Sequence, residues 1–240
     1  DFHFAPTVTS KANLLRENID QDKIFIFFFT VIDALVNTVN RSYRFADENL
    51  HNIISGNGRL ILVTTHRREN LGAPMRQVYQ ALKEVIVTHP DVRVIFPVHK
   101  NPKVREIVEQ ELGHLDRVHL IEPLDYEPFA NLMAKVDIVL TDSGGIQEEA
   151  PALGKPVLVL RDTTERPEAV QAGTVKLVGT AFEDVLRETN KLLDDEQYYR
   201  QMADACNPYG DGKASERIVK TILAAYGYPV ERLTEFSSEI

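Results

Sequence analysis

The chain has 240 residues, 43% of them hydrophobic and 26% charged, which is the composition of an ordinary globular protein with a sizeable core. Its net charge of −9 argues against a general nucleic-acid binder, because no basic surplus is present to meet a phosphate backbone. The single cysteine, Cys206, allows no internal disulfide and no thiolate metal cluster, which fits a reducing cytoplasm. The most apolar run, residues 24–29, is too short to span a bilayer, so we expect a buried strand there.

The first part of the chain has a mixed pattern. Thr9 or Ser10 is placed to cap a helix over residues 11–18. After the apolar strand, residues 30–40 have helical spacing, with valine and leucine recurring on one stripe. Residues 47–58 are mostly polar and end in Ser-Gly-Asn-Gly, which predicts a loop or linker.

From residue 59 onward, short apolar runs alternate with stretches of helical spacing. The expected strands cover residues 60–64, 92–98, 118–121, 136–140, 156–160 and 175–178. The expected helices cover residues 74–88, 102–112, 127–134, 146 to about 151–154, 181–193, 196–205 and, after a tight turn, 215–226. Strands and helices that alternate at this spacing predict an α/β fold with a Rossmann-like, doubly wound parallel sheet and right-handed crossovers.

The stretch around the fourth of these strands carries the clearest ligand signal. A buried apolar run leads into a helix through Asp142-Ser143-Gly144-Gly145, and glycines let the backbone approach a ligand at which the helical N–H groups point. Glu149 follows one helical turn later on the same face, where a carboxylate can accept hydrogen bonds from a ribose diol. The pattern suggests a nucleoside diphosphate site; the alternative is an ordinary connection in which Ser143 caps the helix.

Four other strands also end in polar or charged residues. In a doubly wound sheet, ligands bind beyond the carboxyl ends of the strands, so we expect these loops to share one site whose cations neutralise a pyrophosphate. The loops are His66-Arg67-Arg68-Glu69-Asn70, His99-Lys100-Asn101-Pro102, Glu122-Pro123-Leu124-Asp125-Tyr126 and Arg161 to Glu168. Structural alternatives stay open: a helix cap at His66, solvated Arg67 and Arg68, a surface pair of Arg166 with Glu168, and core packing instead of base stacking at Phe129.

Together these motifs resemble one family, the non-hydrolysing bacterial UDP-N-acetylglucosamine 2-epimerases. The resemblance covers nearly the whole chain, and its longest segments are too specific to arise by chance. The matching segments are H-F-A-P-T from His3, L-L-R-E-N from Leu14, T-V-I-D-A-L from Thr30, T-H-R-R-E-N from Thr65, P-V-H-K-N-P from Pro97, L-T-D-S-G-G-I-Q-E-E-A-P from Leu140, L-G-K-P-V-L-V-L-R-D-T-T-E-R-P-E from Leu153, A-G-T-V-K-L-V-G-T from Ala172 and N-P-Y-G-D-G from Asn207.

The resemblance implies two Rossmann-like domains facing a cleft, as in the GT-B group of glycosyltransferases, with this chain as the second domain. Residues 1–30 would be a remnant of the first domain, 31–213 the UDP-binding domain, and 214–240 a helix crossing back with a tail. The implied isomerase interconverts UDP-N-acetylglucosamine and UDP-N-acetylmannosamine: it removes the C2 proton, expels UDP to leave 2-acetamidoglucal, and adds UDP back. The family uses no metal or other cofactor, and we expect a cytoplasmic homodimer with no nucleic-acid or membrane partner.

Site residues follow from the resemblance position by position. Ser143, Gly144 and Gly145 resemble the residues that hold the diphosphate of UDP. Glu149 resembles the residue that holds the ribose, and Phe129 matches a position beside the uracil.

The same resemblance places four further side chains. Arg166 and His66 match positions near the phosphates, and His66 is the one catalytic residue implied in this half, where it stabilises the leaving UDP. Arg67 and His99 match positions that bind a second UDP-N-acetylglucosamine as an allosteric activator in the bacterial family.

Two departures from the family pattern are visible. The first-domain segments Gly-Thr-Arg-Pro-Glu, Gly-Asp-Thr, Glu-Ala-Gly-Leu-Arg and Pro-Glu-Glu have no counterpart here, and the carboxylates proposed to move the C2 protons lie in them. In addition, Phe27-Phe28-Phe29 replace the family's Thr-Gly-Asn, so we expect the crossover between the domains to be stiff or misfitted. The alternative functions are a GT-B glycosyltransferase donor domain and a nucleotide-sugar-binding module without activity.

Overall fold

The computed structural model describes residues 2–231, which fall into two compact units. One unit contains the residues up to Thr38 together with those from Asn207 onward, and the other contains Val39–Cys206. The domain boundaries at residues 30 and 213 stay predictions. No helix in the described part of the chain has both the length and the apolar character needed to cross a membrane.

The larger unit is built on a six-stranded sheet in which all neighbouring strands are parallel. The strand order is β5-β4-β3-β6-β7-β8, so the chain starts in the middle, runs to one edge, returns to the middle and runs to the other edge. The predicted doubly wound parallel sheet is therefore confirmed, and its topological switch point lies between β3 and β6. The strands are β3 (Arg59–Thr64), β4 (Val92–Pro97), β5 (Val118–Ile121), β6 (Ile138–Thr141), β7 (Val157–Val159) and β8 (Val175–Leu177).

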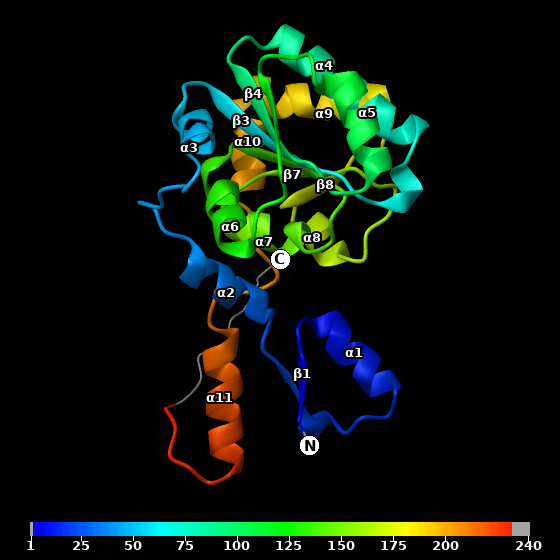
Figure 1. Cartoon of the computed structure of the whole chain (residues 1–240). Helices are drawn as coiled ribbons and strands as arrows, with labels where there is room; N and C mark the ends of the chain where they lie inside the picture. The colour runs from blue at the N-terminus through cyan, green and yellow to red at the C-terminus, as the bar shows by residue number, and fades with distance from the viewer. Residues whose placement is uncertain (1, 232–240) are drawn as a thin grey trace. The chain divides into compact units, whose positions relative to one another are not determined.

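Helices cover both faces of this sheet (Figure 1). Helices α4, α5 and α9 lie together on one face, and α6 and α7 lie on the other. All four residues of β6 are buried, as expected for a strand covered on both sides. The helices of this unit are α3 (Glu48–Ser55), α4 (Ala73–Thr88), α5 (Pro102–Leu112), α6 (Tyr126–Lys135), α7 (Ile146–Ala152), α8 (Pro167–Gln171), α9 (Phe182–Asp194) and α10 (Glu196–Ala203), with a 3-10 turn η2 (Arg68–Asn70).

The smaller unit contains a pair of short parallel strands, β1 (His3–Ala5) and β2 (Ile24–Ile26), joined through α1 (Val8–Arg16) and the 3-10 turn η1 (Gln21–Lys23). Phenylalanine rings from and beside these strands pack on one another, at Phe2, Phe4, Phe25 and Phe27. Helix α2 (Thr30–Thr38) contacts α11 (Ala214–Ala225), the last helix of the described chain.

Two expectations for this unit are wrong. Helix α1 begins at Val8 and is capped by Thr7, whose hydroxyl accepts the Ser10 N–H at 3.1 Å, so neither Thr9 nor Ser10 is the cap. The strand expected over residues 24–29 stops at Ile26, because Phe28 has a φ of 68° and a left-handed residue cannot continue a strand.

The prediction of a loop or linker over residues 47–58 is also wrong, because these residues contain α3. The Asp47 carboxylate accepts the N–H groups of Asn49 and Leu50, at 2.8 and 3.2 Å, and so fixes the start of the helix. Leu50 is the one buried residue of α3, so the sequence has too few buried apolar positions here to indicate a helix.

Candidate functional site

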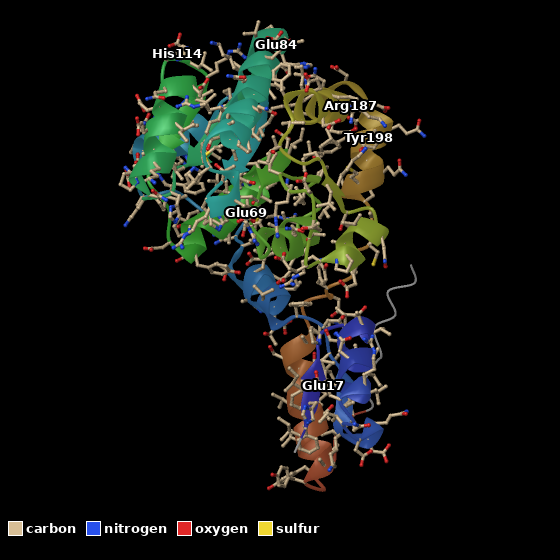
Figure 2. The ribbon with its side chains drawn as sticks, turned by 90° about the vertical axis from the view of Figure 1, so that its right-hand side faces the viewer. Glu17, Glu69, Glu84, His114, Arg187 and Tyr198 are labelled. Carbon is tan, nitrogen blue, oxygen red and sulfur yellow. The ribbon has the colours of Figure 1, made fainter. Side chains whose placement is uncertain are left out.

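The site lies where β3 and β6 end side by side. Thr64 and Thr141 are register partners at these ends, and their hydroxyls are 2.6 Å apart. The loops that follow carry His66 on one strand and Asp142 to Gly145 on the other. Figure 2 shows Glu69, from the first of these loops, at the end of this unit opposite to Glu84 and His114. The predicted residues therefore share the carboxyl end of the sheet.

Asp142 organises the centre of this region. Its side chain has no exposed surface, and its carboxylate accepts the backbone N–H of His66 at 3.0 Å and that of Arg67 at 2.9 Å. The Asn70 amide adds a donor at 3.3 Å and also reaches the Leu160 carbonyl on the neighbouring strand end. Burial alone raises the pKa of Asp142, but the hydrogen bonds from His66 and the two backbone groups outweigh it and lower that pKa.

His66 stands over this carboxylate. Its Nδ1 lies 3.1 Å from Asp142 Oδ1, while 44% of its side chain stays exposed. The His99 ring stacks on it, with centroids 5.7 Å apart and an angle of 22° between the planes. The hydrogen bond to Asp142 raises the pKa of His66 above its ordinary value, against the opposing effect of partial burial.

The glycine turn opens toward solvent. A Cβ atom added at Gly144 or Gly145 would meet no heavy atom within 4 Å, and neither residue has a positive φ. The backbone of this chain therefore does not require glycine at either position, whereas a ligand lying against the turn would. Gly145 begins α7 without any side-chain cap, so Ser143 is not the cap of this helix.

Glu149 lies one turn into α7 and is 8% exposed. The Tyr126 hydroxyl, at the start of α6, donates a hydrogen bond to Glu149 Oε1 at 2.8 Å. Burial raises the pKa of Glu149, with a smaller contribution from the neighbouring Glu148. Phe129 follows Tyr126 by one turn of α6 and is half-buried.

The loop after β7 is tied to the glycine turn through Gln147, which is fully buried. Its amide donates to the Ser143 carbonyl at 3.1 Å and accepts from the Thr164 hydroxyl at 2.6 Å. Thr164 in turn accepts the Arg166 N–H at 3.0 Å, and the Arg166 guanidinium forms an ion pair with Glu148 on α7. Arg166 is thereby held beside the turn.

Arg67 joins the same two loops from the other side. Its Nε donates to the Asp142 carbonyl at 2.9 Å, and its guanidinium lies 3.4 Å from Glu69 and 3.6 Å from Glu165. Glu165 also pairs with Arg161 at 2.6 Å, and this hydrogen bond lowers the pKa of Glu165 to about 2. Arg68 is exposed, which agrees with the alternative that its side chain is solvated.

All nine predicted site residues thus lie in the larger unit, on loops and helix starts at one end of its sheet. His66 contacts His99, and Arg166 joins α7 next to Glu149, while the roles assigned to them stay predictions. Sequence reasoning did not single out Asp142, Tyr126 or Gln147 as site residues. Asp142 could have been predicted as a site residue, because it is an acidic residue directly after a buried strand.

Comparison with known proteins identifies the family of this chain. The family model described as "UDP-N-acetylglucosamine 2-epimerase" matches residues 1–223. The chain belongs to the UDP-N-acetylglucosamine 2-epimerase family. The Bacillus subtilis relative of that name is 51% identical over 241 residues, which cover 100% of this chain and 62% of the relative.

Solved structures agree with this family assignment. The "S. aureus MnaA-UDP co-structure" superposes with a TM-score of 0.90 at 46% identity, covering 99% of this chain and 64% of that one. The epimerase from Neisseria meningitidis bound to UDP-GlcNAc superposes with a TM-score of 0.80 at 45% identity, covering 93% of this chain and 61% of that one. The chain therefore spans about three fifths of the length of the relatives that it matches.

Proposed function

We propose that this chain is the UDP-binding part of a non-hydrolysing UDP-N-acetylglucosamine 2-epimerase. The observation that carries the proposal is the open Gly144-Gly145 turn at the switch point, with the Glu149 carboxylate one helical turn away. Family membership and the solved relatives with UDP or UDP-GlcNAc support this choice of ligand. We further propose that the chain corresponds to the second domain of the GT-B-type fold.

In this proposal, the turn of Ser143, Gly144 and Gly145 receives the diphosphate, because its backbone can be approached without a side chain in the way. The Glu149 carboxylate accepts hydrogen bonds from the ribose hydroxyls, in place of or in addition to the one from the Tyr126 hydroxyl. Phe129 lies beside the uracil, and Arg166 supplies positive charge next to the phosphates.

The reaction of the whole enzyme would interconvert UDP-N-acetylglucosamine and UDP-N-acetylmannosamine. Loss of the C2 proton and cleavage of the bond between C1 and the UDP oxygen give 2-acetamidoglucal, and re-addition of UDP with a proton on the opposite face completes epimerisation. His66 is the member of this chain that stabilises the UDP oxygen as its negative charge develops. Arg67 and His99 would bind a second UDP-N-acetylglucosamine as activator.

The remaining assignments are part of the same proposal. Residues 1–30 belong to the first domain, 31–213 form the UDP-binding domain, and 214–240 return toward the first domain, although residues 232–240 lie outside the described part. The enzyme would act as a cytoplasmic homodimer without metal or cofactor. The carboxylates that move the C2 proton would come from the portion of the relatives that this chain does not span.

Titration calorimetry with UDP, and with uridine as a ligand control, tests the nucleotide site. We expect UDP to bind and uridine to bind much more weakly, because the turn recognises the diphosphate. Gly144→Ala should keep the thermal midpoint, since its Cβ meets no atom of the chain, but should weaken UDP binding by at least tenfold. An unchanged affinity in this variant would place the diphosphate elsewhere. Arg166→Ala removes the positive charge proposed to lie next to the phosphates. Arg200→Ala removes a positive charge from α10 instead and is the control for that variant.

A further inference from the structure

The carboxylate beneath His66 has a geometry that restricts what the imidazole can do. Asp142 is held by two backbone N–H groups and the Asn70 amide, so it cannot turn away from the ring. Its pKa is lowered, and an ionised carboxylate is an acceptor only. The ring nitrogen 3.1 Å from it must therefore carry the proton.

This fixes the tautomer of His66. With a proton on Nδ1, the neutral ring presents an unprotonated Nε2, and the protonated ring presents an Nε2–H donor. Because 44% of the side chain is exposed, the ring is accessible from outside while its other edge is anchored. A carboxylate in this position also stabilises the imidazolium form relative to the neutral form.

The other charged and titratable groups around the ring have weaker effects. His99 stacks on its face, and Arg67 and Glu69 approach from the same loop with opposite charges. Arg67 lowers the pKa of His66 and Glu69 raises it, so their contributions oppose each other. Asp142 is left as the partner that sets the ring's protonation and orientation.

We propose that Asp142 is a positioning residue for His66, which fixes the Nδ1–H tautomer and favours the imidazolium form, whose Nε2–H faces the anion of the bound nucleotide. The inference rests on the proposed function for the identity of that anion. When the bond between C1 and the UDP oxygen breaks, its electron pair passes to the oxygen, and the Nε2–H donates a hydrogen bond to it. The imidazolium keeps its proton throughout, so the step is balanced without proton transfer.

Nitrogen-15 NMR of the histidine rings in the 240-residue chain tests this directly. The His66 signals are assigned by their loss in His66→Gln. We expect the neutral ring to be protonated at Nδ1, and its pKa to fall in Asp142→Asn. Asp137→Asn is the matched control. Asp137 directly precedes the same strand, β6, at its other end, and its carboxylate accepts the Leu60 N–H at 2.7 Å. This variant therefore shows the effect of losing a structural carboxylate that does not contact His66. His66 should titrate unchanged in that variant.

A neutral His66 protonated at Nε2 in the unaltered chain would overturn the proposal, and this measurement decides even if Asp142→Asn does not fold. An unchanged pKa of His66 in a folded Asp142→Asn chain would overturn it as well. In calorimetry at pH 7.5, UDP affinity should fall by about tenfold in Asp142→Asn, as expected for one lost charge-assisted hydrogen bond, and should stay unchanged in Asp137→Asn. Absence of UDP binding by the unaltered chain would instead contradict the proposed function, while the ring titration still judges the Asp142–His66 pair.

Discussion

Phe28 has a backbone conformation that does not suit its side chain. Among the described residues other than glycine, only Asn18 and Phe28 have a positive φ, at 60° and 68°. Asparagine tolerates the left-handed region, whereas a bulky side chain is strained in it by about 1–2 kcal/mol. The resemblance described in the sequence analysis implies glycine at this position, and glycine would adopt this φ without strain.

Two truncations at this position should separate backbone strain from loss of the ring. Phe28→Ala and Phe28→Gly both remove the ring, but only glycine relieves the left-handed strain, so we expect Phe28→Gly to be more stable by about 1 kcal/mol. Chemical denaturation of both variants measures the difference. At Phe29, whose φ is not positive, the order should reverse, because glycine there only adds freedom to the unfolded chain. If the glycine variant were the more stable one at both positions, or the alanine variant at both, the assignment of strain to Phe28 would be contradicted.

Glu149 illustrates a conflict between stability and binding. Burial raises its pKa, so the folded state favours the protonated carboxyl, and its contribution to stability is largest below the ordinary value and is lost as the pH rises above it. Glu149→Gln should therefore raise the thermal midpoint at pH 8 but not at pH 4, and should weaken UDP binding by about tenfold. Calorimetry of unfolding and of binding measures both effects. The exposed Glu84→Gln is the control, and a lower midpoint at pH 8 in Glu149→Gln would refute the argument.

At the scale of elements, α11 depends on a residue far away in sequence. Its own N-cap, Lys213, gives no side-chain hydrogen bond. The Asp33 carboxylate on α2 accepts the N–H of Ser215 at 2.7 Å and that of Ala214 at 3.1 Å instead. One acidic side chain from α2 thus satisfies the first donors of α11 and links the two helices of the smaller unit.

Asp33→Ala should expose the start of α11 to exchange with solvent. We expect faster amide hydrogen exchange at Ala214 and Ser215 and a loss of about 1–2 kcal/mol in stability, which is typical of a lost helix cap. Asp47→Ala removes an equivalent cap from α3 in the larger unit and should speed exchange at Asn49 and Leu50 only. If exchange in α11 were unaffected by Asp33→Ala, the cap would not contribute to holding this helix.

The elements that could be predicted from sequence are those with a strong, long pattern. Helix α5 and strand β5 were predicted to the residue, because proline at the start of one and a short apolar run in the other mark their limits. Helix α3 was missed because only Leu50 on it is buried, and α8 was missed because five residues are too few to show a helical period. The early end of β2 depends on the φ of Phe28, which no local pattern indicates.

The site was predictable as a set of loops but not as a set of contacts. The strand-end rule correctly indicated which segments lie at the carboxyl end of the sheet. The pairs that shape the site join residues far apart in the chain: Tyr126 with Glu149, Thr164 with Gln147, and Asp142 with His66. A polar residue in a loop has many possible partners, and only the fold selects one.

At the scale of the whole molecule, every candidate site residue belongs to one of the two units, Val39–Cys206. Nucleotide binding should accordingly need only residues of this unit. Hydrogen exchange with and without UDP should show protection in the loops after β3, β6 and β7 and none in α1 or α11.

Epimerisation should depend on a portion that this chain does not supply. The chain spans 62% of the Bacillus subtilis relative, and we propose that the proton-moving carboxylates lie in the remainder. We expect the 240 residues alone to bind UDP without measurable turnover of UDP-N-acetylglucosamine, and turnover to appear when the remaining part of that relative is fused or added. His66→Gln in the reconstituted enzyme should abolish turnover, while the surface variant Arg200→Ala should not change it. Robust epimerisation by the chain alone would show that its own residues move the C2 proton, and sugar transfer to an acceptor without a free glycal would favour a glycosyltransferase.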